Sequence, residues 1–223
     1  MKYLLQALIL LLFSSSIVGQ SNNLDSLKQV ALSFYQKNDR ESAEKIYQEI
    51  ILYDTLDIDV IFNLGIINLE LGNEKEAIYF LQKAVILRDR EAAKILKEEL
   101  SQEINYSEIM HADDVDEIPK YIYKDKELNL IEDSGLNHKL TSTIIKNLRK
   151  SEVIKDSNFS GKIYVTLEIE RDGSLICKVL KGTGSEKVDI EIKTIIENSG
   201  KFSPGKYQNI DVGVYGWNWS VII

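Results

Sequence analysis

The sequence predicts an α+β protein in which an all-α helical repeat is followed by a domain of two helices and a three-stranded antiparallel sheet. The first observation is a self-similarity at a spacing of 34 residues between positions 24 and 92, which is the length of one helix–turn–helix repeat. The second is a run of apolar patterns after residue 136, in the order helix, strand, strand, helix, strand. Two helices on one face of such a sheet form an α+β sandwich.

The composition excludes several classes of protein. The chain has 223 residues with 44% hydrophobic and 28% charged side chains, which is ordinary for a globular protein. One cysteine excludes an internal disulfide framework, and two histidines leave little for a transition-metal site. The net charge of −8 argues against nucleic acid as a partner. We find no nucleophile–base pattern and no phosphate-binding glycine-rich loop, so we expect neither an enzyme nor a cofactor.

The N-terminus has the pattern of a secretory signal peptide over residues 1–20. Lys2 precedes an apolar run from Tyr3 to Phe13, and small residues follow as far as Gly19, where we expect cleavage. The run is shorter than the roughly 20 residues that a membrane-spanning helix needs. The alternative is that the segment stays uncleaved and anchors the protein in the inner membrane.

The repeat becomes visible when the sequence from Leu24 is aligned with the sequence from Ile58. Small residues recur where two helices would cross, and large apolar residues recur beside them; these pairs are Ala31/Gly65, Ala43/Ala77 and Tyr47/Leu81. Asn38 and Gly72 fall at the expected tight turn. Ala93, Leu96, Leu100 and Ile104 then form one apolar stripe, which predicts a cap helix and a helical domain over residues 24–104.

This pattern resembles the tetratricopeptide repeat. The resemblance implies a concave groove that binds a peptide or protein and is lined by the first helix of each unit. The residues so implied are Lys28, Gln29, Leu32, Tyr35, Gln36, Asp59, Phe62, Asn63, Ile66 and Glu70. The alternative is that Leu32, Phe62 and Ile66 only pack against their neighbours.

Residues 105–135 are predicted to form an acidic linker or an extended arm. They hold nine acidic and three basic side chains, with poor periodicity and with Pro119, one of the two prolines of the chain. His111 lies near Asp113 and Asp114, which we interpret as part of a solvated charge run rather than a metal site.

A β-hairpin is the clearest local signal in the second domain, which we place at residues 136–223. Ile163, Val165, Leu167 and Ile169 alternate with polar residues, so one face of this strand is apolar. Asp172-Gly173 predicts a tight turn, and a second strand returns from Leu175 to Lys181.

Two amphipathic helices flank the hairpin. The first is marked by Leu136, Leu140, Ile144, Ile145 and Leu148 and ends near Lys150. The second, over residues 186–198, is marked by Val188, Ile192, Ile195 and Ile196 and is followed by Gly200, the usual residue just past a helix end.

The final strand, from Ile210 onward, changes the parity of its apolar residues. Ile210, Val212 and Val214 are even-numbered, whereas Trp217, Trp219 and Val221 are odd-numbered. A one-residue slip of this kind is what a β-bulge produces, so we predict a bulge or sharp twist between Gly213 and Gly216.

The second domain resembles the TonB C-terminal domain family. The matching segments are Gly161–Val165, Arg171–Ser174, Val179–Gly182 and Phe202–Lys206, preceded by Asp116–Pro119. The resemblance implies that the final strand pairs with an extended segment of an outer-membrane transporter or another envelope protein. The edge-strand residues so implied are Ile210, Val212, Val214, Tyr215, Trp217 and Trp219. The alternative for the tryptophans is that they cover the sheet's own core.

These features together predict a periplasmic, non-enzymatic interaction protein that binds by edge-strand addition and through the repeat groove, and that is linked to outer-membrane transport. Homodimerisation through sheet edges is a further option. Alternatives are an energy transducer held by an uncleaved anchor and a module that binds cell wall or a ligand. A transducer needs a stiff spacer, and two prolines in the whole chain do not supply one.

Overall fold

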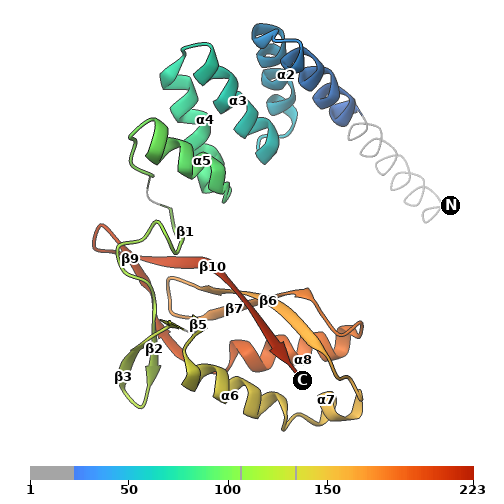
Figure 1. Ribbon diagram of the computed structural model, residues 1–223, viewed down its shortest axis with the longest axis vertical. Coiled ribbons are helices and arrows are strands. Elements are labelled where there is room, and N and C mark those ends of the chain that lie inside the picture. The colour runs from blue at the N-terminus through green and yellow to red at the C-terminus, as the bar shows by residue number, and fades with distance from the viewer. Residues whose placement is uncertain (1–22, 106, 134) are drawn as a thin grey trace, which may run out of the picture. The chain divides into compact units, whose positions relative to one another are not determined.

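The computed structural model describes residues 23–105, 107–133 and 135–223 (Figure 1). The chain divides into two compact units, residues 1–105 and 106–223. The predicted signal peptide falls outside the described residues. Both helices and sheets are present, which confirms the α+β class.

The first unit consists of helical hairpins (Figure 1). Residues 23–36 are helical, and the elements that follow are α2 (Arg40–Tyr53), α3 (Ile58–Glu70), α4 (Glu74–Ile86), α5 (Arg90–Lys94) and the π-helix η1 (Ile95–Glu99). Aspartates cap three of these helices: the side chains of Asp39, Asp57 and Asp89 each accept a hydrogen bond from a backbone N–H of the first turn.

The turns inside the hairpins repeat with the sequence. Asn38 and Gly72 take positive φ angles of 63° and 78°. In each turn the following residue closes the helix end: the N–H of Asp39 donates to Phe34 O (3.0 Å), and that of Asn73 donates to Asn68 O (2.8 Å). This hydrogen bond is the one that ends a helix in a Schellman motif. The role predicted for Asn38 and Gly72 is confirmed.

The helix crossings also follow the predicted exchange of small and large residues. Ala31, Ala43 and Ala77 are fully buried, and Tyr47 and Leu81 are buried beside them. A Cβ placed on Gly65 would lie 2.8 Å from Cδ2 of Leu81, which is too close for any side chain to fit without movement. Gly65 therefore lets α3 approach α4 closely enough for Leu81 to fill the space between them.

The predicted cap helix ends earlier than Ile104. The helical backbone stops at Glu99, although Ala93, Leu96 and Ile104 are buried as expected. The buried side chain of Gln82 replaces the missing helical turn, since it donates to Glu103 O (2.6 Å) and accepts from Asn105 N (2.9 Å). A side-chain amide with one donor and one acceptor engaged holds residues 103–105 as an extended segment against α4.

The second unit contains a central sheet with helices. Its elements are β1 (Ile109–His111), β2 (Lys120–Tyr123), β3 (Lys126–Asn129), β4 (Ile131–Glu132), β5 (Gly135–Leu136), α6 (His138–Leu148), α7 (Glu152–Asp156), β6 (Lys162–Ile169), β7 (Leu175–Lys181), α8 (Glu186–Glu197), β8 (Lys201–Ser203), β9 (Gly205–Tyr207) and β10 (Ile210–Ile222). The predicted order helix, strand, strand, helix, strand is present in α6, β6, β7, α8 and β10.

The segment 105–135 differs from the expected linker. It carries β1 to β4 and the start of β5, and most of it belongs to the second compact unit. β1 pairs in parallel with β10, and β2 pairs with both β3 and β8. Tyr121 and Leu130 are buried in the core of this unit. The acidic run of residues 113–117, between β1 and β2, hid these strands. Their partners β10 and β8 lie far along the chain, so the pairing leaves no local periodicity.

The central sheet has the order β1-β10-β6-β7, with β9 also pairing with β10. The predicted three antiparallel strands are β10, β6 and β7, and the parallel β1 extends them. The apolar face of β6 packs against α6 and α8, which lie on one side of the sheet (Figure 1). The buried residues that α6 and α8 contribute are Leu140, Ile144, Leu148, Val188, Ile192 and Ile196.

The hairpin turn and the bulge were both predicted. Gly173 takes a φ of 82°, and Asp172 Oδ1 accepts a hydrogen bond from the N–H of Ser174 (2.8 Å). In β10 the register against β6 shifts between Tyr215 and Trp217, and Gly216 has a φ of 122°. The bulge keeps Val214 opposite Ile169 and Trp217 opposite Leu167, so the apolar residues on both sides of it face the core.

Candidate binding site at the open edge of the sheet

β10 is paired unequally on its two edges. One edge pairs with β6 from Val214 to Ile222. The same edge pairs with β9 over residues 210–212, because Lys206 bonds to Glu117 and leaves Gly205 and Tyr207 to bond to β10. The other edge pairs with β1 over residues 213–215, where the N–H of Gly213 donates to Glu108 O and Tyr215 O accepts from the N–H of Ala112. From Gly216 to Ile222, no strand in the described part of the chain pairs with this second edge. The end of β10 is therefore an open sheet edge.

The hydrogen bonds at the chain end show which backbone groups the open edge presents. Gly161 and Ile223 exchange both backbone hydrogen bonds, at 3.0 and 3.1 Å. Because such pairs alternate along an antiparallel ladder, the odd-numbered residues from Trp217 to Val221 bond to β6. The N–H and C=O groups of Asn218, Ser220 and Ile222 consequently point away from β6, toward the open edge.

The opposite edge of the sheet, on β7, is protected. Glu197 at the end of α8 accepts a hydrogen bond from the backbone N–H of Cys177, at 3.0 Å. This N–H points outward from the sheet, because Cys177 lies opposite Leu167, whose own backbone groups bond to β10. A carboxylate that occupies an outward N–H is a way to prevent strand addition. The sheet is therefore open on β10 and protected on β7.

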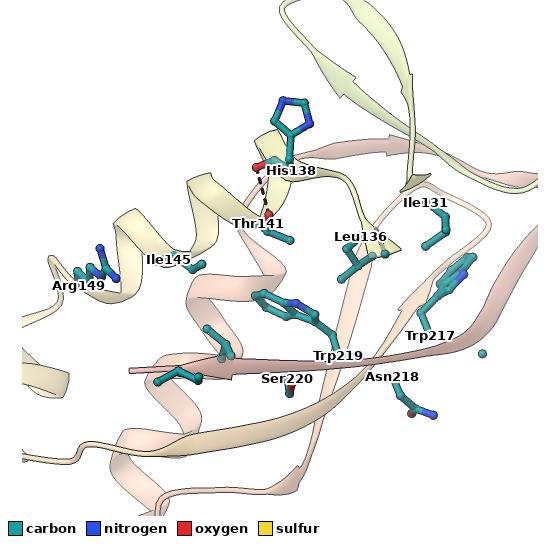
Figure 2. Close-up of a pocket in the computed structure, with 14 residues that line it drawn as sticks. Ile131, Leu136, His138, Thr141, Ile145, Arg149, Trp217, Asn218, Trp219 and Ser220 are labelled. Carbon is teal, nitrogen blue, oxygen red and sulfur yellow. Dashed lines mark hydrogen bonds between the residues drawn. The ribbon is translucent and has the colours of Figure 1, made fainter. Parts of the chain in front are cut away.

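A groove runs along the open edge of β10. It has a volume of about 880 Å³ and is walled by α6 and by residues of β4 and β5 (Figure 2). Thr141, Ile145 and Arg149 line it at four-residue steps, so they form one stripe on α6. This stripe lies beside the buried stripe of Leu140, Ile144 and Leu148. Ile131 and Leu136 complete the apolar part of the wall.

The two tryptophans form the floor of this groove. Figure 2 shows Trp219 below Thr141 and Ile145 of α6, and Trp217 next to Ile131. Both are partly buried and pack against the core of the unit, so they cover the core and line the groove at the same time. Asn218 and Ser220 extend from the other side of the strand (Figure 2). An added strand would thus direct alternate side chains toward the tryptophans.

The charged groups near the groove differ in their pairing. Glu132 accepts hydrogen bonds from the N–H of His138 (3.1 Å) and from the Asn137 side chain (2.7 Å), and its Oε2 lies 3.0 Å from Nδ1 of His138. The pKa of Glu132 is lowered, first by the hydrogen bond with the His138 side chain and then by the hydrogen bond from the His138 backbone N–H. Arg149 is exposed at the other end of α6 and has no ion-pair partner among the described residues.

The residues predicted for the edge strand divide into two groups. Val214 and Tyr215 pair with β1 on one edge and with β6 on the other, and Ile210 and Val212 pair with β9. None of these four lies on the open part of β10, from Gly216 to Ile222. Trp217 and Trp219 lie on the open part. The open backbone groups of Asn218, Ser220 and Ile222 were not in the predicted set. The parity change at Gly216 was the sequence signal that could have located them.

The residues predicted for the repeat groove lie on the first helices of the hairpins, but several contact one another. Lys28 forms an ion pair with Asp57, and the Tyr35 hydroxyl donates to Glu70 (2.9 Å). Glu70 also forms an ion pair with Arg40. Phe62 and Ile66 pack against a buried cluster, and Asn63 is half-buried. Gln29, Leu32, Gln36 and Asp59 are exposed.

Two comparisons of the sequence with known proteins identify no relative. No protein-family model matches the chain, and a search of curated proteins finds no match. Within residues 23–223, apart from positions 106 and 134, no helix is long and apolar enough to cross a membrane. The same residues contain no cluster of three metal-ligating side chains.

Proposed function

We propose that this protein is a non-enzymatic, periplasmic interaction protein that binds an extended segment of a partner protein as an added strand on β10. The observation that carries the proposal is the open edge from Gly216 to Ile222 beside a groove. Main-chain hydrogen bonds from Asn218, Ser220 and Ile222 would supply affinity, and alternate side chains in the groove would supply specificity.

The protected edge of β7 supports this choice of surface. If the open edge of β10 had no partner, it would be expected to carry a protecting group like Glu197 on β7, because unprotected edges promote aggregation. On the open part of β10, no residue that lines the groove is an aspartate or glutamate, and two half-buried tryptophans lie there instead. Tryptophan is enriched among the residues that dominate binding energy at protein interfaces.

The proposed partner is an envelope protein, with an outer-membrane transporter as the first candidate because of the resemblance of residues 136–223 to the TonB C-terminal domain. The helical repeat is proposed as a second protein-binding surface, where Gln29, Leu32, Gln36 and Asp59 are exposed. We place the protein in the periplasm on the strength of its N-terminal pattern.

Proline substitution at Ser220 tests strand addition. Ser220→Pro removes an N–H that faces the open edge and leaves the hydrogen bonds to β6 in place, whereas Ser220→Ala keeps that N–H. Peptides selected from a display library on the unmodified protein should bind Ser220→Pro about tenfold more weakly, since a main-chain hydrogen bond is lost and the ring obstructs the edge. They should bind Ser220→Ala with unchanged affinity. Equal binding to both variants would refute the proposal.

Amide hydrogen exchange gives a second test that needs no variant. In the free protein the amides of Asn218 and Ser220 should exchange fast, and that of Trp219, which bonds to β6, should exchange slowly. A bound peptide should slow exchange at Asn218 and Ser220. If these amides are already protected in the free protein, or stay unprotected when the peptide is bound, β10 is not the binding edge.

A further inference from the structure

The lining of the groove contains one formal charge, and it is positive. The lining residues are Ile131, Gly135, Leu136, His138, Thr141, Ile145, Arg149 and 216–222, and none of them is an aspartate or glutamate. His138 is close to Glu132, which lies outside this lining, whereas Arg149 has no carboxylate partner in the part of the chain that the structure describes. The groove is thus positive at its Arg149 end.

The positive charge of Arg149 lies beside the C-terminal end of β10. Figure 2 shows α6 and the open part of β10 running alongside each other, with His138 and Trp217 toward one end and Arg149 toward the other. Arg149 follows Ile145 by one helical turn and lies at the C-terminal end of α6. The dipole of α6 places partial negative charge at this end of the helix, and the Arg149 guanidinium offsets it. Because the Arg149 side chain is exposed, it can still bind a carboxylate of a partner.

We infer that the bound segment carries a carboxylate at the end that lies beside Ile222, where it pairs with Arg149, and apolar side chains at the alternate positions that face Trp217 and Trp219. The inference rests on the proposed function and names the chemical class of its ligand: an extended, apolar segment with an acidic end. The second compact unit, residues 106–223, holds 16 basic and 19 acidic side chains, so the positive charge is local to the Arg149 end of the groove.

The carboxylate can come from an acidic side chain or from a chain terminus, and synthetic peptides distinguish these sources. The probes are capped peptides of about six residues in which valine and threonine alternate, with glutamate at the first or at the last position. Matched peptides carry glutamine there, and one further peptide ends in glutamine with a free C-terminal carboxylate. Each is titrated against the full-length protein by fluorescence anisotropy.

The expected result is a preference of about threefold for one glutamate peptide over its glutamine match, as an exposed ion pair provides. Preference for first-position glutamate indicates an antiparallel bound strand, and preference for last-position glutamate or the free carboxylate indicates a parallel one. Arg149→Gln should abolish the preference, and Arg149→Glu should reverse it. The preference should also decline when salt is raised.

Arg171→Gln is the matched control, because Arg171 is an exposed arginine on the β6–β7 turn and does not line the groove. This variant should keep the preference. If the peptides bind but show no dependence on charge or on Arg149, the inference is refuted and strand addition stands. If none of the peptides binds and library selection also yields no binder, strand addition itself fails.

Discussion

Alanine at Gly173 is predicted to destabilise the second unit far more than alanine at Gly184. Both glycines have nearly the same positive φ angle, 82° and 85°. They differ in their surroundings: a Cβ on Gly173 would lie 2.2 Å from the carbonyl oxygen of Phe202, whereas a Cβ on Gly184 would meet no atom within 4 Å. The pair therefore separates steric overlap from backbone strain.

The expected loss in the free energy of unfolding follows from the backbone strain and the steric overlap. A left-handed conformation costs alanine about 1 kcal/mol, and the loss of glycine's freedom in the unfolded chain offsets part of it. Gly184→Ala should therefore lower the free energy of unfolding by about 1 kcal/mol or less. At Gly173 the overlap is more than 1 Å deeper than an ordinary contact of 3.4–4 Å. Because Phe202 lies in β8, which pairs with β2, relief requires backbone movement that costs about 1–3 kcal/mol more.

Urea unfolding followed by tryptophan emission measures this difference. The protein has two tryptophans, Trp217 and Trp219, and both lie in β10, so the signal reports the second unit alone. The expected free energies of unfolding decrease in the order unmodified protein, Gly184→Ala, Gly173→Ala. If the two variants differ by less than about 0.5 kcal/mol, the close approach of the hairpin turn to β8 is refuted.

Three further predictions concern other parts of the molecule. Gly65→Ala should lower the stability of the first unit by about 1–3 kcal/mol, measured by circular dichroism, and Leu81→Val should recover part of the loss by making room for the methyl group. Burial raises the pKa of the Cys177 thiol to about 12, so Ellman's reagent at pH 8 should label this residue only after unfolding. The lowered pKa of Glu132 means that its carboxylate stabilises the fold near neutral pH and that this contribution is lost as the pH falls through the lowered pKa, below 4.5. His138→Ala should reduce that loss.

Each of these has an outcome that would contradict it. A double variant of Gly65 and Leu81 no more stable than Gly65→Ala alone would show that the two residues do not share the same space. Labelling of Cys177 in the native protein at the rate of a free thiol would show that it is accessible. An acid dependence unchanged by His138→Ala would assign that dependence to other carboxylates.

Local patterns in the sequence predicted much of the fold. The 34-residue spacing located the turns at Asn38 and Gly72, and strict alternation located β6. The parity change in the last strand predicted the bulge at Gly216 before any partner strand was known. These predictions succeed because side-chain periodicity and glycine's backbone freedom are properties of the chain over a few residues.

The sequence alone determined which face of α6, α8 and β6 is buried, because burial of one face imposes a period on the residues themselves. Only the tertiary structure decided which edge of the sheet is open. Whether an edge is paired depends on β1, which joins β10 across about 100 residues of chain, and on Glu197, which happens to lie beside Cys177. Backbone hydrogen bonds between distant segments do not depend on side-chain type, so no pattern in the sequence records them. The placement of Asn218, Ser220 and Arg149 around one groove is for this reason a property of the folded chain.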